Sequence, residues 1–314
     1  RNILKNLGRY IPQVAVSVFL LVMVIITIFL TDIPISGLIS NTLVRFFMNG
    51  VLVLSLVPML NAGIGINYGL SIGVLAGLLG MCIAINFHLG GIAGFAVAVI
   101  LAIVFSLPSG YGYGKILNRV RGQEEITALF FGSAVVFAMS FFWAVAPFTN
   151  TEMLWPIGGS GLRHTIGLQS TFSHVLNNFA AFSIGGVTIP AGGILFFGII
   201  CLFLWIFPRT KIGWAMAVVG ENESFAAASG IDVNRYRTLA VMLSTALGSV
   251  GICVWAQSYG FIELYGSADM MAFPAASSIL LGGSMGKRAN TLHVILGTFL
   301  FQTVYIFSSP LANT

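Results

Sequence analysis

The chain has 314 residues, of which 57% are hydrophobic and only 7% charged, and its mean hydropathy is +0.98. This composition excludes a water-soluble domain of ordinary proportions and predicts an integral membrane protein. The net charge of +5 comes from 14 Lys and Arg that are spread along the chain, so it forms no dense basic patch for nucleic acid. Cys82, Cys201 and Cys253 fall in apolar segments without metal-ligand spacing, and we expect them to be packing residues.

Nine apolar runs follow one another along the chain, and most approach the roughly 20 residues that a helix needs to cross a bilayer. They cover residues 11–31, 43–60, 64–87, 91–107, 126–146, 190–207, 239–257, 271–281 and 292–307. The run 271–281 is short enough to be a half-helix or a re-entrant segment. We therefore predict an all-α polytopic helical bundle that forms one transmembrane domain over residues 1–314. Because the chain begins without Met and ends just after an apolar run, we expect about ten spans in the intact protein.

Lys and Arg indicate which loops face the cytoplasm, because cytoplasmic loops are enriched in both residues. Twelve of the 14 fall before the first run, after the fourth, within 208–237 and at 287–288. These positions all share one side if the N-terminus is cytoplasmic. Arg45 and Arg163 are then expected outside, and residues 147–189 form an external segment that is polar and rich in glycine.

The third run carries small residues at every fourth position, which would let another helix approach closely. These residues are Gly65, Gly69, Gly73 and Gly77. On a continuous helix over 64–87 we expect them to pack against a neighbour, with Ile72 facing lipid. The first half of the run also holds Asn67, Tyr68 and Ser71. Polar groups and glycines together at this depth indicate either a bend or a helix that lines a water-accessible cavity, and a tightly packed interior helix is the other interpretation; all stay open.

A transport pathway needs groups that hold a solute without binding it too tightly, so neutral polar and aromatic side chains are expected there. Asn67, Tyr68 and Ser71 are the leading candidates, and we expect them to be reachable from water. Phe130, Gln257 and Phe273 follow as weaker candidates. Their alternatives are helix packing for the first three residues, lipid contact or core for the phenylalanines, and an interfacial position for Gln257.

Residues 208–237 form a polar and basic interruption between apolar runs. Asn222 can cap a short helix, Glu223 suits its positive end, and Gly230 can end it in the left-handed conformation, with Ile231 folding back onto Ala226. A helix of about seven residues is not stable alone, so we expect neighbouring helices or a second protein to hold it. Phe225 would anchor it in a shallow groove; an ordinary surface helix is the alternative.

Other motif-like features predict no chemistry. The glycines of SGYGYGK at 109–115 follow a membrane run, so a flexible cytoplasmic turn is expected there and not a phosphate loop. The four histidines share no ligand spacing, and no metal or catalytic site is predicted. All nine acidic residues are expected in loops or at helix ends. Since ion-coupled transporters usually place an ionisable group at membrane depth, this favours another energy source.

Three stretches together carry a family resemblance: GIGINYGLSIGVLAGLLG at 63–80, GENESFAAASGIDVNRYR at 220–237 and AASSILLGGSMG at 275–286. The chain resembles the permease subunits of ribose-type bacterial ABC importers, a group that includes simple-sugar, nucleoside and branched-chain amino-acid permeases. The likeness covers nearly the whole chain. Two departures leave the solute open: Asn67 and Tyr68 stand where sugar permeases carry an acidic GGIDLS-like pattern, and Lys287, Arg288 and Ala289 replace a second glycine pair.

The resemblance implies a permease without enzymatic activity, in the bacterial cytoplasmic membrane, importing a small polar solute of the sugar or nucleoside class. It implies ABC ATPase subunits that hold ATP and Mg, a second permease copy or paralogue, and an extracytoplasmic binding protein. The capped helix would be the coupling helix, contacting the ATPase through Glu221, Asn222, Glu223, Ser224, Phe225, Ala226, Ala227, Ser229 and Gly230. The alternatives are an ion-coupled secondary transporter with broken helices and a membrane receptor without transport.

Overall fold

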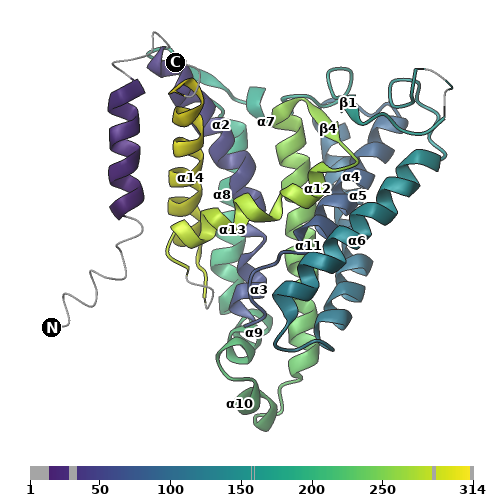
Figure 1. Cartoon of the computed structure of the whole chain (residues 1–314), viewed down its shortest axis with the longest axis vertical. Coiled ribbons are helices and arrows are strands. Elements are labelled where there is room, and N and C mark those ends of the chain that lie inside the picture. Colours follow the sequence, from purple (N-terminus) through teal and green to yellow (C-terminus); the bar gives the residue numbers. More distant parts are fainter. Residues whose placement is uncertain (1–13, 28–33, 157, 159, 285–287, 312–314) are drawn as a thin grey trace.

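The computed structural model describes residues 14–27, 34–156, 158, 160–284 and 288–311. Its long helices lie side by side between two ends of different character (Figure 1). Short strands and loops gather at the upper end, and the helices α9 (Lys211–Glu221) and α10 (Glu223–Ala228) project at the lower end. The expected cations Arg1, Lys5, Arg9 and Lys287 lie outside the described residues.

Six helical segments in the described part of the chain are long and apolar enough to cross a membrane. They are α2 (Ile35–Leu54) with α3 (Val57–Asn61), α5 (Gly91–Leu117), α6 (Glu124–Val145), α8 (Ala191–Ile206) with the 3-10 turn η1 (Phe207–Arg209), α11 (Val233–Tyr259) and α14 (Thr291–Leu311). Three shorter apolar helices fall in the other predicted runs, at Val14–Thr27, Leu70–Asn86 and Ser267–Leu281. The chain is thus a helical polytopic membrane protein, with six helical segments of spanning length among the described residues.

Two predicted segment boundaries were wrong. α2 begins at Ile35 instead of residue 43, so Arg45 lies inside the helix and not in an external loop. The third run is not one helix: α3 ends at Asn61, residues 62–69 form a non-helical break, and α4 covers Leu70–Asn86. The break follows from local chemistry, because Gly63 and Gly65 take positive φ values of 70° and 102° that a helix excludes.

The motif SGYGYGK was also misinterpreted, since it forms the last turns of α5 instead of a flexible turn. Pro108 lies inside this helix. Gly110 and Gly114 lie against α11, where an added Cβ would meet the Cα atoms of Met242 and Thr238 at 3.0 and 3.1 Å. These glycines permit close contact between two membrane helices.

The centre of the molecule is formed by α4, α5 and α11, which pack closely together. Gly73 and Gly77 of α4 face α11: an added Cβ at Gly73 would lie 2.5 Å from the carbonyl oxygen of Thr245, and one at Gly77 would lie 2.6 Å from that of Ser249. Gly65 and Gly69 precede α4, so they are not part of a helical ladder. Ile72, expected to face lipid, is buried.

The described residues form four short strands, three of them within residues 147–189, and the all-α prediction did not include them. β1 (Thr165–Gly167) pairs antiparallel with β4 (Phe261–Glu263), and β2 (Phe182–Ile184) pairs antiparallel with β3 (Val187–Ile189). The short helix α7 (Val175–Asn178) lies in the same segment. After β4 the chain forms α12 (Ser267–Met270) and α13 (Ala272–Leu281), which lie across the bundle instead of along it (Figure 1).

Candidate functional site

The projecting segment at the lower end is built from helices that carry their own caps. The side chain of Thr210 accepts a hydrogen bond from the Gly213 amide at the start of α9. Asn222 accepts one from the Phe225 amide, at 2.9 Å, and so begins α10 as predicted. Asp232 does the same for α11, with the Arg235 amide at 3.1 Å.

The end of α10 also follows the prediction. Gly230 has a φ of 79°, and the Ile231 amide donates to the carbonyl oxygen of Ala226 at 3.0 Å. Ala226 is fully buried and packs with Val219 and Val233. The opposite face is open: Phe225 is 62% exposed. The neighbouring small residues Ser224, Ala227, Ala228, Ser229 and Gly230 are also exposed. α10 therefore presents one large apolar side chain amid small residues.

A buried arginine of α11 ties α10 to the membrane helices. Arg237 is 2% exposed and forms ion pairs with Glu223 of α10 and, at 2.5 Å, with Glu124 in the first turn of α6. Its Nε donates to Asn118 at 3.2 Å. Arg121 adds a more exposed ion pair to Glu223 at 2.9 Å. Because one buried cation serves two carboxylates on different helices, it fixes the position of α10 relative to α6.

Glu125, the neighbour of Glu124, reaches the other way, into the break at 62–69. Its Oε1 accepts a hydrogen bond from the Ile66 amide at 3.0 Å. The adjacent Asn67 is fully buried: it donates to Ser244 of α11 at 2.9 Å and accepts from the Tyr113 hydroxyl of α5 at 3.0 Å. Contacts therefore run without interruption from α10, through the consecutive Glu124 and Glu125 of α6, to the break inside the membrane domain.

The break turns different side chains inward and outward. Asn67 and Ser71 are buried, 0% and 2% exposed, so in this conformation they are not reachable from water as expected. The Ser71 hydroxyl has no hydrogen-bond partner among the described residues. Tyr68 is half-buried instead, and its ring lies 5.8 Å from that of Phe273 on α13. Tyr68 and Phe273 thus form the accessible side of the break.

The short helix before α13 carries an acidic residue. Asp269 of α12 accepts a hydrogen bond from Ser133, at 2.8 Å, in the middle of α6. Asp269 lies in the first turn of α12, so it agrees with the prediction that acidic residues occupy loops or helix ends. Phe130, 71% exposed, lies one helical turn before Ser133 on α6. Gln257 lies apart from this group: it accepts a hydrogen bond from the Leu176 amide and donates one to Asn177, so it holds α7 against the end of α11.

Sequence reasoning missed Glu124, Glu125, Arg237, Asp269 and Arg45 as site residues. A signal existed for the first pair, because two adjacent glutamates open an otherwise apolar helix. Arg237 was counted only as a cytoplasmic cation, and its two partners lie 14 and 113 residues away in the chain. No local pattern predicts such contacts.

The comparisons with known proteins agree with this architecture. The family model described as "Branched-chain amino acid transport system / permease component" matches residues 38–314, which is most of the chain. The chain belongs to this permease family. Residues 220–237 and 63–80, which carried the resemblance, lie within the match.

Individual relatives of the permease are distant. It is 27% identical over 283 residues to the autoinducer 2 import system permease protein LsrD of Salmonella typhimurium, covering 84% of this chain and 75% of that protein. It is 26% identical to a tyrosine transport system permease protein of Clostridioides difficile, covering 45% and 46%. It is 27% identical to the D-allose transport system permease protein AlsC of Escherichia coli, covering 42% and 40%. The chain thus spans less than half the length of several of these relatives. No solved structure matches it significantly.

Proposed function

We propose that the permease is the membrane subunit of an ATP-driven importer and that α10 is the helix through which separate ATPase subunits, which would hold ATP and Mg, drive it. The observation that carries this proposal is the open face of α10, with Phe225 exposed on a helix too short to be stable alone. Glu221 adds an exposed ion pair with Arg288 at 2.5 Å, which joins α9 to the start of α14. The proposal assigns the contact with the ATPase to nine residues around α10: Glu221, Asn222, Glu223, Ser224, Phe225, Ala226, Ala227, Ser229 and Gly230.

The path from α10 to the break supplies the mechanical part. A displacement of α10 would act on Arg237 through Glu223, then on α6 through Glu124, and Glu125 would carry it to Ile66. Arg237 and Glu124 form the buried part of this path, and a charged hydrogen bond between buried groups resists stretching more than an exposed one does. The break, with Tyr68 and Phe273 on its accessible side, is then the part that changes during transport.

The solute in this proposal is small and polar, of the sugar or nucleoside class. Aromatic faces suit the apolar face of such a molecule, and the carboxylate of Asp269 suits its hydroxyls. Phe130 extends the same face along α6. Relatives of the chain are named as permease proteins of D-allose, autoinducer 2 and tyrosine transport systems, so the family accommodates several solutes. A second permease copy or paralogue, a binding protein outside the cytoplasm, and an inner membrane with the N-terminus inside complete the proposed assembly.

The variant Phe225→Asp tests the proposal. Since this side chain is exposed, we expect an unchanged melting temperature of the purified permease, together with loss of co-purification with its ATPase subunit and loss of uptake. Phe225→Leu keeps an apolar anchor and should retain both. If Phe225→Asp still associates and transports normally, α10 is an ordinary surface helix. If no ATPase subunit co-purifies with the unaltered chain and an ion gradient drives uptake, the secondary-transporter alternative holds.

A further inference from the structure

Arg45 occupies an unusual position for a charged residue. It is the eleventh residue of α2, so at a rise of about 1.5 Å per residue it lies roughly 15 Å from the outer end of that helix. α2 and α3 together form a helical segment of spanning length. Charged side chains at such depth are rare and usually mark a site for a solute, an ion or another charge.

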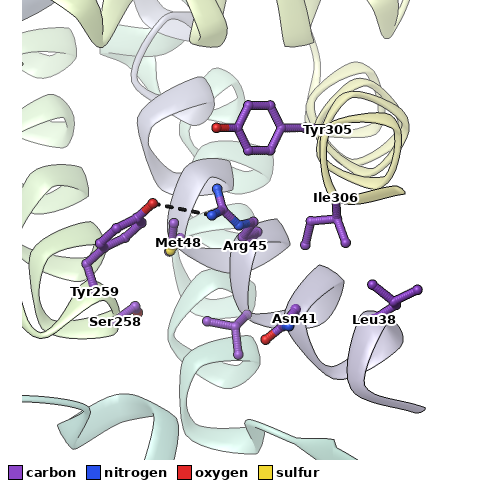
Figure 2. Close-up of a pocket in the computed structure, with 9 residues that line it drawn as sticks. Leu38, Asn41, Arg45, Met48, Ser258, Tyr259, Tyr305 and Ile306 are labelled. Atoms are coloured by element: carbon purple, nitrogen blue, oxygen red, sulfur yellow. Dashed lines mark hydrogen bonds between the residues drawn. The ribbon is translucent and has the colours of Figure 1, made fainter. Parts of the chain in front are cut away.

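The partners of Arg45 are aromatic instead of acidic. Its Nη2 donates to the Tyr259 hydroxyl at 3.3 Å, and its guanidinium carbon lies 5.7 Å from the centre of the Tyr259 ring and 4.9 Å from that of Tyr305. Figure 2 shows the guanidinium between the two tyrosines. Within the described ranges, no acidic residue forms an ion pair with it. The positive charge is therefore held in place without being neutralised by those residues.

A cavity of about 500 Å³ opens in front of this charge, between α2, α11 and α14. This volume falls in the range of about 300 to 1,000 Å³ typical of small-molecule sites. Asn41 and Ser258 place polar groups on its wall, and Leu38, Met48 and Ile306 line it with apolar surface (Figure 2). The mixture of one cation, a few polar groups and an apolar wall is suited to a ligand with one charged and one apolar end.

The aromatic wall is fixed before any ligand arrives. The Tyr259 ring stacks on Trp255 of the same helix, with centroids 4.4 Å apart and planes at 13°. The ring of Phe261 also packs against the Tyr259 ring, with centroids 5.1 Å apart and planes nearly perpendicular. A pre-formed wall keeps the guanidinium aimed without a further entropic cost on binding.

We propose that this Arg45 pocket binds the carboxylate of a small solute with an apolar or aromatic body. A guanidinium fork matches a planar carboxylate through two parallel hydrogen bonds. One carboxylate balances one guanidinium, whereas a doubly charged phosphate would leave an unpaired negative charge in a setting of low polarity. The pocket thus adds small carboxylates to the ligands of this protein. It needs only residues of one chain, so it stands independently of ATP-driven transport and of the break.

Equilibrium dialysis of radiolabelled benzoate against the purified chain in detergent tests the site. Benzamide, which has the same shape without the charge, serves as the competitor. We expect saturable binding of benzoate, at most weak displacement by benzamide, and a loss of affinity of about tenfold or more in Arg45→Gln. Arg45→Lys keeps the charge but loses the fork, so its affinity should fall in between. Arg209→Gln is the matched control, because Arg209 lies 3.7 Å over the Trp205 ring on an exposed surface.

Several results would overturn the proposal. Equal binding of benzamide and benzoate would show an aromatic pocket that does not recognise charge. Equal affinity in Arg45→Gln, or an equal loss in Arg209→Gln, would place the benzoate elsewhere. Absence of benzoate binding would also contradict the proposal, and melting temperatures in nanodiscs would then show whether a lipid phosphate binds Arg45. In that case the unaltered chain would melt at a higher temperature than Arg45→Gln in phosphatidylglycerol nanodiscs, but not in phosphatidylcholine nanodiscs. None of these outcomes depends on an ATPase, so they leave the proposed coupling role untouched.

Discussion

Two arginines of the membrane domain, Arg237 near the start of α11 and Arg45 within α2, have opposite surroundings. Arg237 is almost fully buried and contacts two carboxylates on two other helices. Arg45 is only partly buried and contacts two tyrosines, with no acidic partner in the described part of the chain. A cation whose carboxylate partners come from the same chain fixes helices relative to one another. A cation left with aromatic neighbours in front of a cavity is free to take its counter-charge from a ligand.

Removing Arg237 should have the largest effect on stability. Arg237→Met leaves Glu124 and Glu223 without their shared partner, and Glu124 is only 12% exposed. Breaking a buried pair costs roughly 3 to 5 kcal/mol, and we expect about 3 because Glu223 is partly solvated and keeps Arg121. The melting temperature of the purified permease in detergent should fall strongly, and association with the ATPase should be lost.

Arg288→Met is the matched control for that measurement. Its ion pair with Glu221 has nearly the same length, 2.5 Å, but both side chains are more than half exposed. Such pairs contribute roughly 0 to 1 kcal/mol. Similar losses in both variants would mean that burial does not distinguish the two ion pairs.

The contact between α4 and α11, which runs between the two arginine regions, should show the next largest effect. Gly73→Ala would place a Cβ 2.5 Å from the backbone carbonyl of Thr245, so the helices would have to separate. We expect a loss of roughly 2 to 3 kcal/mol, from overpacking of a contact that cannot yield. Gly198→Ala on α8 adds the same methyl group where nothing lies within 4 Å. Its melting temperature should stay the same or rise, and a comparable fall in both would exclude close packing as the cause.

The break between these regions depends on neutral hydrogen bonds, so its disruption should cost less. Asn67→Leu removes the acceptor of the Tyr113 hydroxyl and the donor to Ser244, and leaves both hydroxyls buried. We expect a loss of about 1 to 2 kcal/mol, because a neutral hydrogen bond contributes roughly 0.5 to 1.5 kcal/mol and two are lost. Uptake should fall further than the lower stability alone accounts for. Tyr68→Phe, which keeps the ring facing Phe273, is the control, and an equal fall in uptake there would direct attention to the Tyr68 hydroxyl.

The sequence predicted the local structure of the projecting segment because its determinants are local. Asn222, Gly230 and Ile231 act within a few residues of the backbone groups that they satisfy, and the structure confirms all three. The apolar runs likewise predicted where the membrane helices lie. A bend was one interpretation of the glycines and polar residues in the third run, but the extent of the break at 62–69 was not predicted, because composition does not reveal which glycines change φ. Arg237 and Asp269 were missed because their partners are distant in the chain.

Arg45 should show the smallest effect on stability, and this sharpens the comparison most. Arg45→Met removes a long hydrogen bond and two cation–π contacts, together worth about 1 kcal/mol, but it also relieves the cost of holding a charge without an acidic partner. Methionine can fill the same apolar wall beside Met48. Without ligand, the melting temperature should therefore change far less than in Arg237→Met.

Asp32 lies outside the described residues, so the double variant Asp32→Asn/Arg45→Met is measured alongside. A large loss in Arg45→Met that Asp32→Asn reverses would identify Asp32 as the partner of Arg45. The two arginines would then play the same structural role, and the charge would not be available to a ligand.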